Sequence, residues 1–378
     1  MPGRRDAGRI WQCKSDHFLH DYGLRQCVTD RRVWVRDSLI LHDHVDDSRL
    51  TSTSVSARAH FYNHWAATFG EPPSSAELSE DFTGIRHHFT PSGSVEVSCL
   101  GVIRNLEALL VGQSLSQSVP TDTPMAADSL RRLLAPDCQS PLVPLLLPLA
   151  QRIAGTIGFI VSTTRPDAYF AYCVVSRFLS ETTLTDLAFR FLLRVAFYIV
   201  STKHLYLTYH PLPPGASRNA LFTASCDSSH GNAGKGLSYA GFVVLSVAGG
   251  AIAWKCVIPK AGDDSPGASE LRIAVRAYKC IQALRTILLD LGVGLHQVLP
   301  TPLYTDSQSV AEGIAAEKIG KNSRWMASRY AMLVWGALYL TILLRTVPSS
   351  GNVSDILTKA LVGEPFVRHR ATLLGHHL

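Results

Sequence analysis

The order of apolar and amphipathic segments predicts an α/β protein. After residue 220 the segments alternate as strand, strand, strand, helix, strand, helix, helix, strand and helix. The pair Gly249-Gly250 separates the second and third of these strands, as a tight hairpin turn requires. Residues 142–210 instead carry apolar side chains at three- and four-residue spacing, which predicts helices. An α/β second half is therefore expected after a helical segment.

Local patterns predict each element of the second half. The expected strands are short apolar runs at 221–226, 239–246, 251–258, 301–305 and 341–347. A long helix is expected over 268–291, because an apolar stripe recurs from Leu271 to Leu288 and Gly292 follows it. Further helices are expected over 307–317 and 323–337. The last helix is expected to begin near Asn352 or Ser354, since both residue types favour N-cap positions.

The first half divides where the composition changes. Residues 1–112 mix short apolar runs with polar turns, and we expect a helix near 7–22 and strands near 32–35 and 38–41. Helices are also expected at 168–179 and 184–201. The segment Pro211 to Gly215 holds three prolines, which disfavours both helix and central strand. The expected segments are 1–112, a mostly helical 113–210, a linker at 211–220, and 221–378.

The composition excludes several classes of protein. With 46% hydrophobic and 17% charged residues among 378, the chain is too apolar for a disordered protein or a coiled coil. Its longest apolar run, Tyr330 to Leu344, is too short to cross a bilayer comfortably, so we expect no membrane span and no membrane partner. The eight cysteines form no CxxC-type pair of the kind that binds zinc. Nothing near the start indicates secretion, so the expected location is intracellular, in cytoplasm or nucleus.

Most of the net positive charge lies in the second half. Residues 221–378 carry fifteen Lys and Arg against ten Asp and Glu, which is +5 of the chain's +6. This excess favours an anionic partner such as nucleic acid. Ordinary solvated charge explains so modest an excess equally well.

Four acids stand at boundaries between the predicted elements of the second half. Asp227 ends the first strand, Glu270 opens the long helix, Asp306 ends the fourth strand and Asp355 opens the last helix. Strand ends and helix starts meet at one edge of an α/β sheet, where these carboxylates would repel one another unless cations neutralise them. Oxygen ligands without His or Cys favour Mg²⁺ or Mn²⁺. Two such ions support an in-line phosphoryl displacement.

Each acid also has an ordinary structural interpretation. An Asp at a strand end is often a turn former, and a Glu in a first helical turn often interacts only with the helix dipole. The order and context of all four acids favour the metal site over four independent structural roles.

Four short segments contain these acids. They are Ser225-Cys226-Asp227-Ser228-Ser229, Ser269-Glu270, Leu303-Tyr304-Thr305-Asp306-Ser307-Gln308-Ser309 and Ser354-Asp355-Ile356-Leu357-Thr358-Lys359. Their sequence and order resemble the acidic motifs of the ribonuclease H domain in copia-type retrotransposon polyproteins, over residues 221–375. The resemblance implies a ribonuclease H-like fold, with a mixed five-stranded sheet flanked by helices. It also implies endonucleolytic cleavage of the RNA strand in RNA–DNA hybrids, with two Mg²⁺ or Mn²⁺ ions bound by the catalytic residues Asp227, Glu270, Asp306 and Asp355.

Upstream segments resemble other parts of the same polyproteins. The segments are Asp6 to Trp11, Tyr22-Gly23-Leu24, His44-Val45-Asp46-Asp47, Thr164 to Asp167, and Thr202 to Tyr209. The first three resemble the last third of the reverse transcriptase palm, and the others resemble the connection to the nuclease. The resemblance implies a partial α+β palm over 1–112 and a thumb- or connection-like segment over 113–210. It also implies that the polymerase portion of the polyprotein is a partner.

The palm-like segment departs from the family pattern. His44 stands where the family has an aromatic residue, and the sequence begins after the position of a further metal-binding aspartate that the polymerase needs. We therefore interpret Asp46 and Asp47 as a vestigial polymerase site and expect no reverse transcriptase activity. A simple hairpin turn is the alternative interpretation of this pair.

Three further residues are candidate nucleic-acid contacts. Ser228 and Gln308 carry short polar groups suited to reading 2′-hydroxyls in a shallow minor groove, and Arg329 suits a phosphate contact. Their alternative roles are helix capping, solvent contact and surface salt bridges. Arg272 replaces the family's second glutamate, and this departure, with His44, motivates an alternative function. That alternative is a catalytically silent fragment of a decayed retrotransposon that binds nucleic acid.

Overall fold

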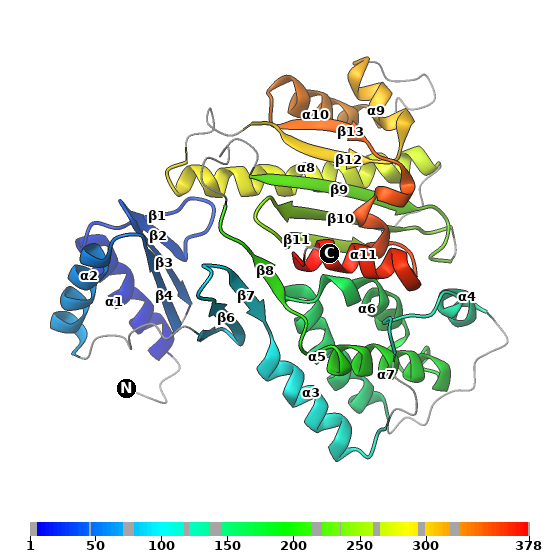
Figure 1. Cartoon of the computed structure of the whole chain (residues 1–378), viewed down its shortest axis with the longest axis horizontal. Helices are drawn as coiled ribbons and strands as arrows, with labels where there is room; N and C mark the ends of the chain where they lie inside the picture. The colour runs from blue at the N-terminus through cyan, green and yellow to red at the C-terminus, as the bar shows by residue number, and fades with distance from the viewer. Residues whose placement is uncertain are drawn as a thin grey trace. The chain divides into compact units, whose positions relative to one another are not determined.

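The computed structural model describes ten stretches of the chain. They are residues 6–44, 47–70, 79–116, 121–135, 146–212, 221–234, 236–259, 265–293, 299–317 and 326–376. Figure 1 labels most of their helices and strands. The chain divides into two compact units, Met1–His88 with Gln282–Gln297, and Phe89–Ile281 with Val298–Leu378. The expected palm-like, connection-like and nuclease segments stay predictions, and most of the expected linker at 211–220 lies outside the described residues.

The first unit contains a small antiparallel sheet with two helices. Its strands are β1 (Arg25–Gln26), β2 (Val33–Arg36), β3 (Leu39–His44) and β4 (Asp47–Ser52), paired in that order, and its helices are α1 (Ala7–Asp21) and α2 (Val55–Phe69). The apolar faces of α1, α2 and the sheet share one core, in which Leu19, Leu41 and Phe61 are buried. The strands β5 (Ser79–Phe82) and β6 (Ile85–Phe89) pair antiparallel. The predicted helix near 7–22 and the strands near 32–35 and 38–41 are thus confirmed.

The first part of the second unit, from Phe89 to about residue 206, is mostly helical. They are α3 (Leu100–Gly112), α4 (Ser129–Leu134), α5 (Leu147–Thr163), the short 3₁₀ turns η2 (Pro166–Ala168) and η3 (Ser176–Phe178), α6 (Tyr169–Val175) and α7 (Asp186–Ser201). The strands β7 (Val95–Ser98) and β8 (Leu207–Tyr209) pair antiparallel beside them. Thr185 caps α7 by accepting a hydrogen bond from the amide of Ala188. The helices predicted at 168–179 and 184–201 are present, the first of them divided among η2, α6 and η3.

A buried ion pair ties two of these helical segments together. The Arg165 guanidinium donates to both carboxylate oxygens of Asp167, at 2.9 and 2.8 Å, and to Thr202 at the end of α7. The Tyr198 hydroxyl donates to Asp167 at 2.6 Å. Burial acts to raise the pKa of Asp167, but the Arg165 charge and these hydrogen bonds outweigh it, so this pKa lies below its ordinary value. The pair is therefore fully satisfied although Arg165 has no exposed surface.

The remainder of the second unit is built on a five-stranded mixed sheet. Its strands are β9 (Phe222–Ser229), β10 (Tyr239–Ser246), β11 (Ala251–Val257), β12 (Thr301–Thr305) and β13 (Ile342–Thr346), in the order β11-β10-β9-β12-β13. The first three pair antiparallel, whereas β12 runs parallel to β9 and β13 parallel to β12. This order places β9 at the centre of the sheet.

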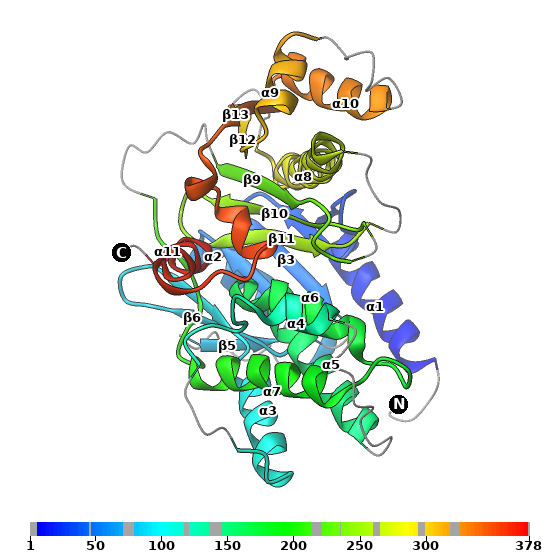
Figure 2. The same ribbon diagram turned by 90° about the vertical axis from the view of Figure 1, so that its right-hand side faces the viewer.

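Helices lie on both faces of this sheet. They are α8 (Pro266–Asp290), α9 (Gln308–Ala315), α10 (Ala327–Leu338) and α11 (Gly363–Leu374), with 3₁₀ turns η6 (Ser349–Gly351) and η7 (Val353–Leu357) before α11. Figure 2 shows α8 and α10 on one side of the sheet and α11 on the other. The strand order, strand directions and flanking helices are those of the predicted ribonuclease H-like fold, so the predicted fold class is confirmed.

Two predicted boundaries were wrong. The strand β9 does not end at Asp227 but continues to Ser229, because Ser228 and Ser229 still pair with Ala240 and Tyr239 of β10. Asp355 does not open the last α-helix, since it lies in the 3₁₀ turn η7 and α11 begins at Gly363.

The apolar run Tyr330 to Leu344 divides between α10 and β13, which correspond to the helix predicted over 323–337 and the strand predicted over 341–347. Within the part of the chain that the structure describes, no helix combines the length and hydrophobicity that crossing a bilayer requires.

The buried pair provides a test of what holds the helical segment together. Replacing Arg165 with Met should destabilise the protein by about 3–5 kcal/mol, because it leaves the Asp167 charge buried and unpaired. The exposed pair of Arg190 with Asp186 is the matched control, and Arg190→Met should cost less than about 1 kcal/mol. Urea unfolding of both variants measures the difference. Equal effects of the two substitutions would contradict this account.

Candidate active site

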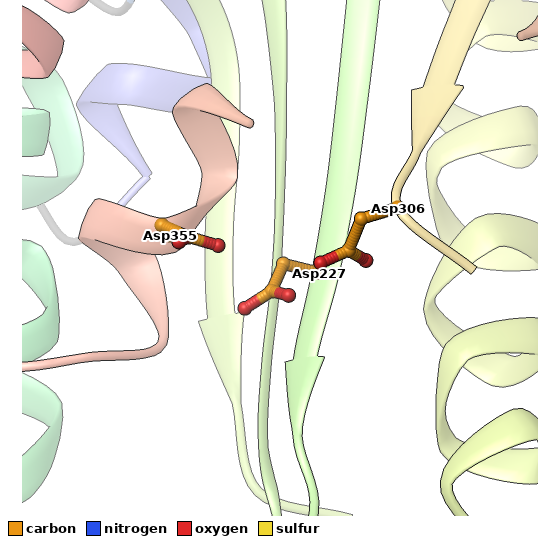
Figure 3. A group of neighbouring side chains, drawn as sticks. All are labelled: Asp227, Asp306 and Asp355. Carbon is orange, nitrogen blue, oxygen red and sulfur yellow. The ribbon is translucent and has the colours of Figure 1, made fainter. Parts of the chain in front are cut away.

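Three carboxylates converge at the centre of the five-stranded sheet. Asp227 lies in β9, Asp306 directly follows β12, and Asp355 lies in η7. One oxygen from each lies within 4.8 Å of the others. In Figure 3 Asp227 stands between the other two, and all three side chains point toward one another. The parallel pairing of β9 with β12 brings the first two together, since it places Leu303 beside Ala224 and Tyr304 beside Ser225.

Hydrogen bonds to β9 position the third carboxylate. The Asn352 side chain accepts from the amide of Ser354 as an N-cap and donates to the carbonyl of Cys226 at 3.0 Å. The hydroxyls of Ser354 and Ser225 lie 2.7 Å apart. These fully buried contacts hold η7 against the central strand and set Asp355 beside Asp227.

A glycine opposite Asp227 permits this close approach. Gly241 of β10 pairs with Asp227, and a Cβ atom added to it would lie 2.6 Å from Leu357 Cβ and 3.2 Å from Thr358. A glycine inside a strand often marks such a site, where another backbone segment passes closely.

Glu270 lies near Asp227 and Asp306, early in α8. Its Oε1 accepts a hydrogen bond from the Ser228 amide at 2.9 Å, whereas its buried Oε2 has no hydrogen-bond partner among the described residues. Burial, together with the charges of Asp227 and Asp306, raises the pKa of Glu270 to about 9. The structure therefore brings Asp227, Asp306 and Asp355 together, and Glu270 lies outside that group but near enough for the charges of Asp227 and Asp306 to act on it.

Three of these acids, Asp227, Glu270 and Asp355, are costly to ionise without a compensating cation. Burial raises the pKa of Asp227 above its ordinary value, although Lys359 and Thr358 oppose the shift. Burial likewise raises the pKa of Asp355 to about 6. Three carboxylates within 4.8 Å of one another, with the unpartnered buried oxygen of Glu270 near two of them, are oxygen ligands of the kind that a hard divalent cation binds. The residues present thus fit the Mg²⁺ or Mn²⁺ expected from the sequence.

Two residues at this site were missed by sequence reasoning. The ammonium of Lys359 lies 2.8 Å from Asp355 Oδ1 and 3.6 Å from Asp227 Oδ2. The hydroxyl of Thr358 donates to Asp227 Oδ2 in a short hydrogen bond. The spacing of four residues between Asp355 and Lys359, which commonly brings an acid and a base together, could have identified the first contact.

The candidate nucleic-acid contacts lie on three different elements. Ser228 follows Asp227 in β9, and its hydroxyl is in a short hydrogen bond with that of Ser269. Gln308 is exposed at the first position of α9, two residues after Asp306, and donates to Glu312. Arg329 is half-buried on α10. Their contact with nucleic acid stays a prediction.

The proposed vestigial polymerase residues belong to the first unit. Asp47 is exposed and opens β4, paired with His44 of β3. Asp46 lies outside the described residues.

Comparison with known proteins gave matches only among solved structures. No protein-family model and no curated protein matches the sequence. LC11-RNase H1, isolated from compost and solved with an RNA/DNA hybrid, aligns with 36% of this chain and 93% of its own, at 13% identity and a TM-score of 0.29. RNase H1 from Halobacterium salinarum aligns over 36% of this chain and 93% of its own, at 19% identity and a TM-score of 0.26.

A foamy viral protease-reverse transcriptase in complex with an RNA/DNA hybrid aligns over 92% of this chain, at 11% identity and a TM-score of 0.42. This chain spans 39% of the length of that protein. At these identities and TM-scores the likenesses assign no activity to the chain.

The raised pKa of Glu270 predicts how stability depends on pH. Because the folded protein holds this proton more tightly than the unfolded chain, stability from this group is complete below the ordinary pKa and is lost as pH rises toward 9. In EDTA, the free energy of unfolding should fall by about 1–3 kcal/mol between pH 6 and pH 9.

Glu270→Gln, which does not ionise, should remove most of this fall. The matched control is Glu364→Gln on the exposed start of α11, which should leave the fall unchanged. Urea denaturation at the two pH values measures each variant. A wild-type pH dependence in Glu270→Gln would show that another group is responsible.

Proposed function

We propose that this chain is a divalent-metal-dependent endonuclease that hydrolyses the RNA strand of RNA–DNA hybrids. The observation that carries the proposal is the convergence of Asp227, Asp306 and Asp355 within 4.8 Å at the centre of a sheet with ribonuclease H-like strand order. Glu270, with an unpartnered buried oxygen, completes the acidic set. The proposal includes an origin in a copia-type retrotransposon, on the strength of the motifs around these residues.

Each acid has a role that follows from its position. Asp227 lies between Asp306 and Asp355 in Figure 3, and these three residues together with Glu270 would hold two Mg²⁺ or Mn²⁺ ions. When bound, such ions supply a hydroxide nucleophile and stabilise the leaving oxygen. Ser349 donates to Asp306 Oδ2 at 2.8 Å and so orients this most exposed of the three aspartates. The motif resemblance implies products with a 5′-phosphate and a 3′-hydroxyl.

The substrate class follows from the proposed fold and from the candidate contacts. An RNA–DNA hybrid presents 2′-hydroxyls in a wide, shallow minor groove that polar side chains can read. Gln308 is exposed beside Asp306, and Ser228 is adjacent to Asp227, so both are close to the acids that would act on the phosphate. Arg329 would contact the phosphate backbone. The palm-like segment contributes no DNA synthesis in this proposal, and Asp46 and Asp47 are vestigial.

Substitution of one acid tests the proposed activity. Asp306→Asn should lower the rate of hybrid cleavage in Mg²⁺ by about 100-fold or more, because it removes a ligand charge while keeping the side-chain size. The exposed Asp47→Asn is the control and should cleave at the wild-type rate. A labelled hybrid measures cleavage, and the same hybrid in EDTA measures binding.

Wild-type protein that binds the hybrid but does not cleave it in Mg²⁺ or Mn²⁺ would contradict the proposed activity. That outcome would support the alternative of a silent fragment that binds nucleic acid.

A further inference from the structure

One lysine provides a positive charge to two of the buried carboxylates. Lys359 forms ion pairs with Asp355 at 2.8 Å and with Asp227 at 3.6 Å. Asp227 is 2% exposed, whereas the Lys359 side chain is 37% exposed. An ammonium group that reaches a buried acid from a partly exposed stem can leave for solvent without unfolding the site.

The backbone of this lysine is held in place while its side chain reaches the acids. The Lys359 amide donates to the carbonyl of Asp355 at 2.9 Å. The neighbouring Thr358 is fully buried and donates its hydroxyl to Asp227. The position of the ammonium is therefore set by the same turn that positions Asp355.

The lysine neutralises one side of the acidic cluster more than the other. Among the described residues, Lys359 forms ion pairs with Asp227 and Asp355, whereas its charge acts on Asp306 and Glu270 without an ion pair. On the other side, Asp306 has a serine hydroxyl, and Glu270 has one backbone amide and an oxygen without a partner. Neutral donors reduce the repulsion between carboxylates less than a full positive charge does.

We propose that Lys359 is a resident cation that a divalent ion must displace from the Asp227–Asp355 side of the cluster. Two divalent ions then bind in unequal steps, the tighter one on the side of Asp306 and Glu270. The weaker step includes release of the ammonium to solvent. This inference rests on the proposed function only in taking the four acids as metal ligands, so it can be tested without cleavage.

Mn²⁺ binding to the metal-free full chain tests the proposal. Wild type should bind two ions with different affinities in calorimetry, and counting of free Mn²⁺ by electron paramagnetic resonance should agree. Lys359→Met should tighten the weaker step about tenfold or more and change the tighter step less than about threefold. Lys359→Arg, which keeps the charge, should resemble wild type. Lys279→Met, at an exposed position of α8, is the matched control and should also resemble wild type.

A measurement on the unaltered protein covers the case in which Lys359→Met does not fold. The rate of acetylation of each lysine by a small amine-reactive reagent, read by mass spectrometry, reports the accessibility of its ammonium. Acetylation of Lys359 should accelerate as the weaker Mn²⁺ step fills, whereas acetylation of Lys279 should stay constant. A purely structural ion pair predicts no such acceleration.

The outcomes separate this proposal from the proposed nuclease. Unchanged or weakened Mn²⁺ binding in a folded Lys359→Met protein, or a constant acetylation rate of Lys359, would overturn the role of the lysine even if the wild type cleaves hybrids. Conversely, Lys359→Met could tighten the weaker Mn²⁺ step while the wild type does not cleave hybrids. That result would support the role of Lys359 as a resident cation and contradict the proposed nuclease activity.

Discussion

The second unit is organised around an ionisable side chain in the middle of its central strand. Asp227 lies in β9 where β10 and β12 flank it, and almost none of its surface is exposed. A carboxylate in that position loses its hydration, so neighbouring elements must supply hydrogen bonds and positive charge. The turn η7 does so through Thr358 and Lys359, and Gly241 leaves the space that the turn occupies. The geometry of the candidate site is therefore inseparable from the packing of the sheet.

Asp167 and Asp227 are both buried in the second unit, but the free-energy cost of burying their charge is offset to different extents. Asp167 has a bidentate arginine and a tyrosine hydroxyl, and its pKa lies below the ordinary value despite complete burial. Asp227 has a shared lysine at longer range and a threonine hydroxyl, and burial raises its pKa. Carboxylates that a fold leaves incompletely neutralised are typical of functional sites, whereas complete pairing is typical of structural ones. The contrast favours the proposed metal-binding role of Asp227 and a structural role for Asp167.

Local patterns were enough to predict most of the fold of the second unit. The strands β10 and β12 have the predicted bounds, because a short apolar run between turn residues depends little on distant packing. The end of β9 and the start of α11 were missed for a different reason. Whether Ser228 stays in the sheet depends on its pairing with Ala240, and whether Asn352 caps an α-helix or a 3₁₀ turn depends on contacts with β9. Such long-range contacts leave no periodic signal in the sequence.

The candidate site, like the fold, was predicted where local patterns decide it and missed where long-range contacts do. The acids were recognisable from their places near the predicted element boundaries, although Asp227 lies inside β9 and Asp355 lies in a 3₁₀ turn. The hydrogen bond from the Ser228 amide to Glu270 and the reach of Lys359 to Asp227 depend on side-chain geometry between distant segments, so neither followed from spacing.

An incompletely neutralised cluster has a consequence for both the metal-free and the metal-bound protein. Four ionised carboxylates at this density would oppose folding, and the single ammonium of Lys359 reduces that opposition on one side. If every carboxylate were paired with a lysine or arginine, the cluster would be stable, but a metal ion would gain little free energy by binding there. Burial instead keeps Glu270 protonated at neutral pH, so a divalent ion that binds this carboxylate must release the proton, and its affinity should rise as pH increases toward 9. The arrangement thus links the folding of the sheet to the binding of its proposed cofactor.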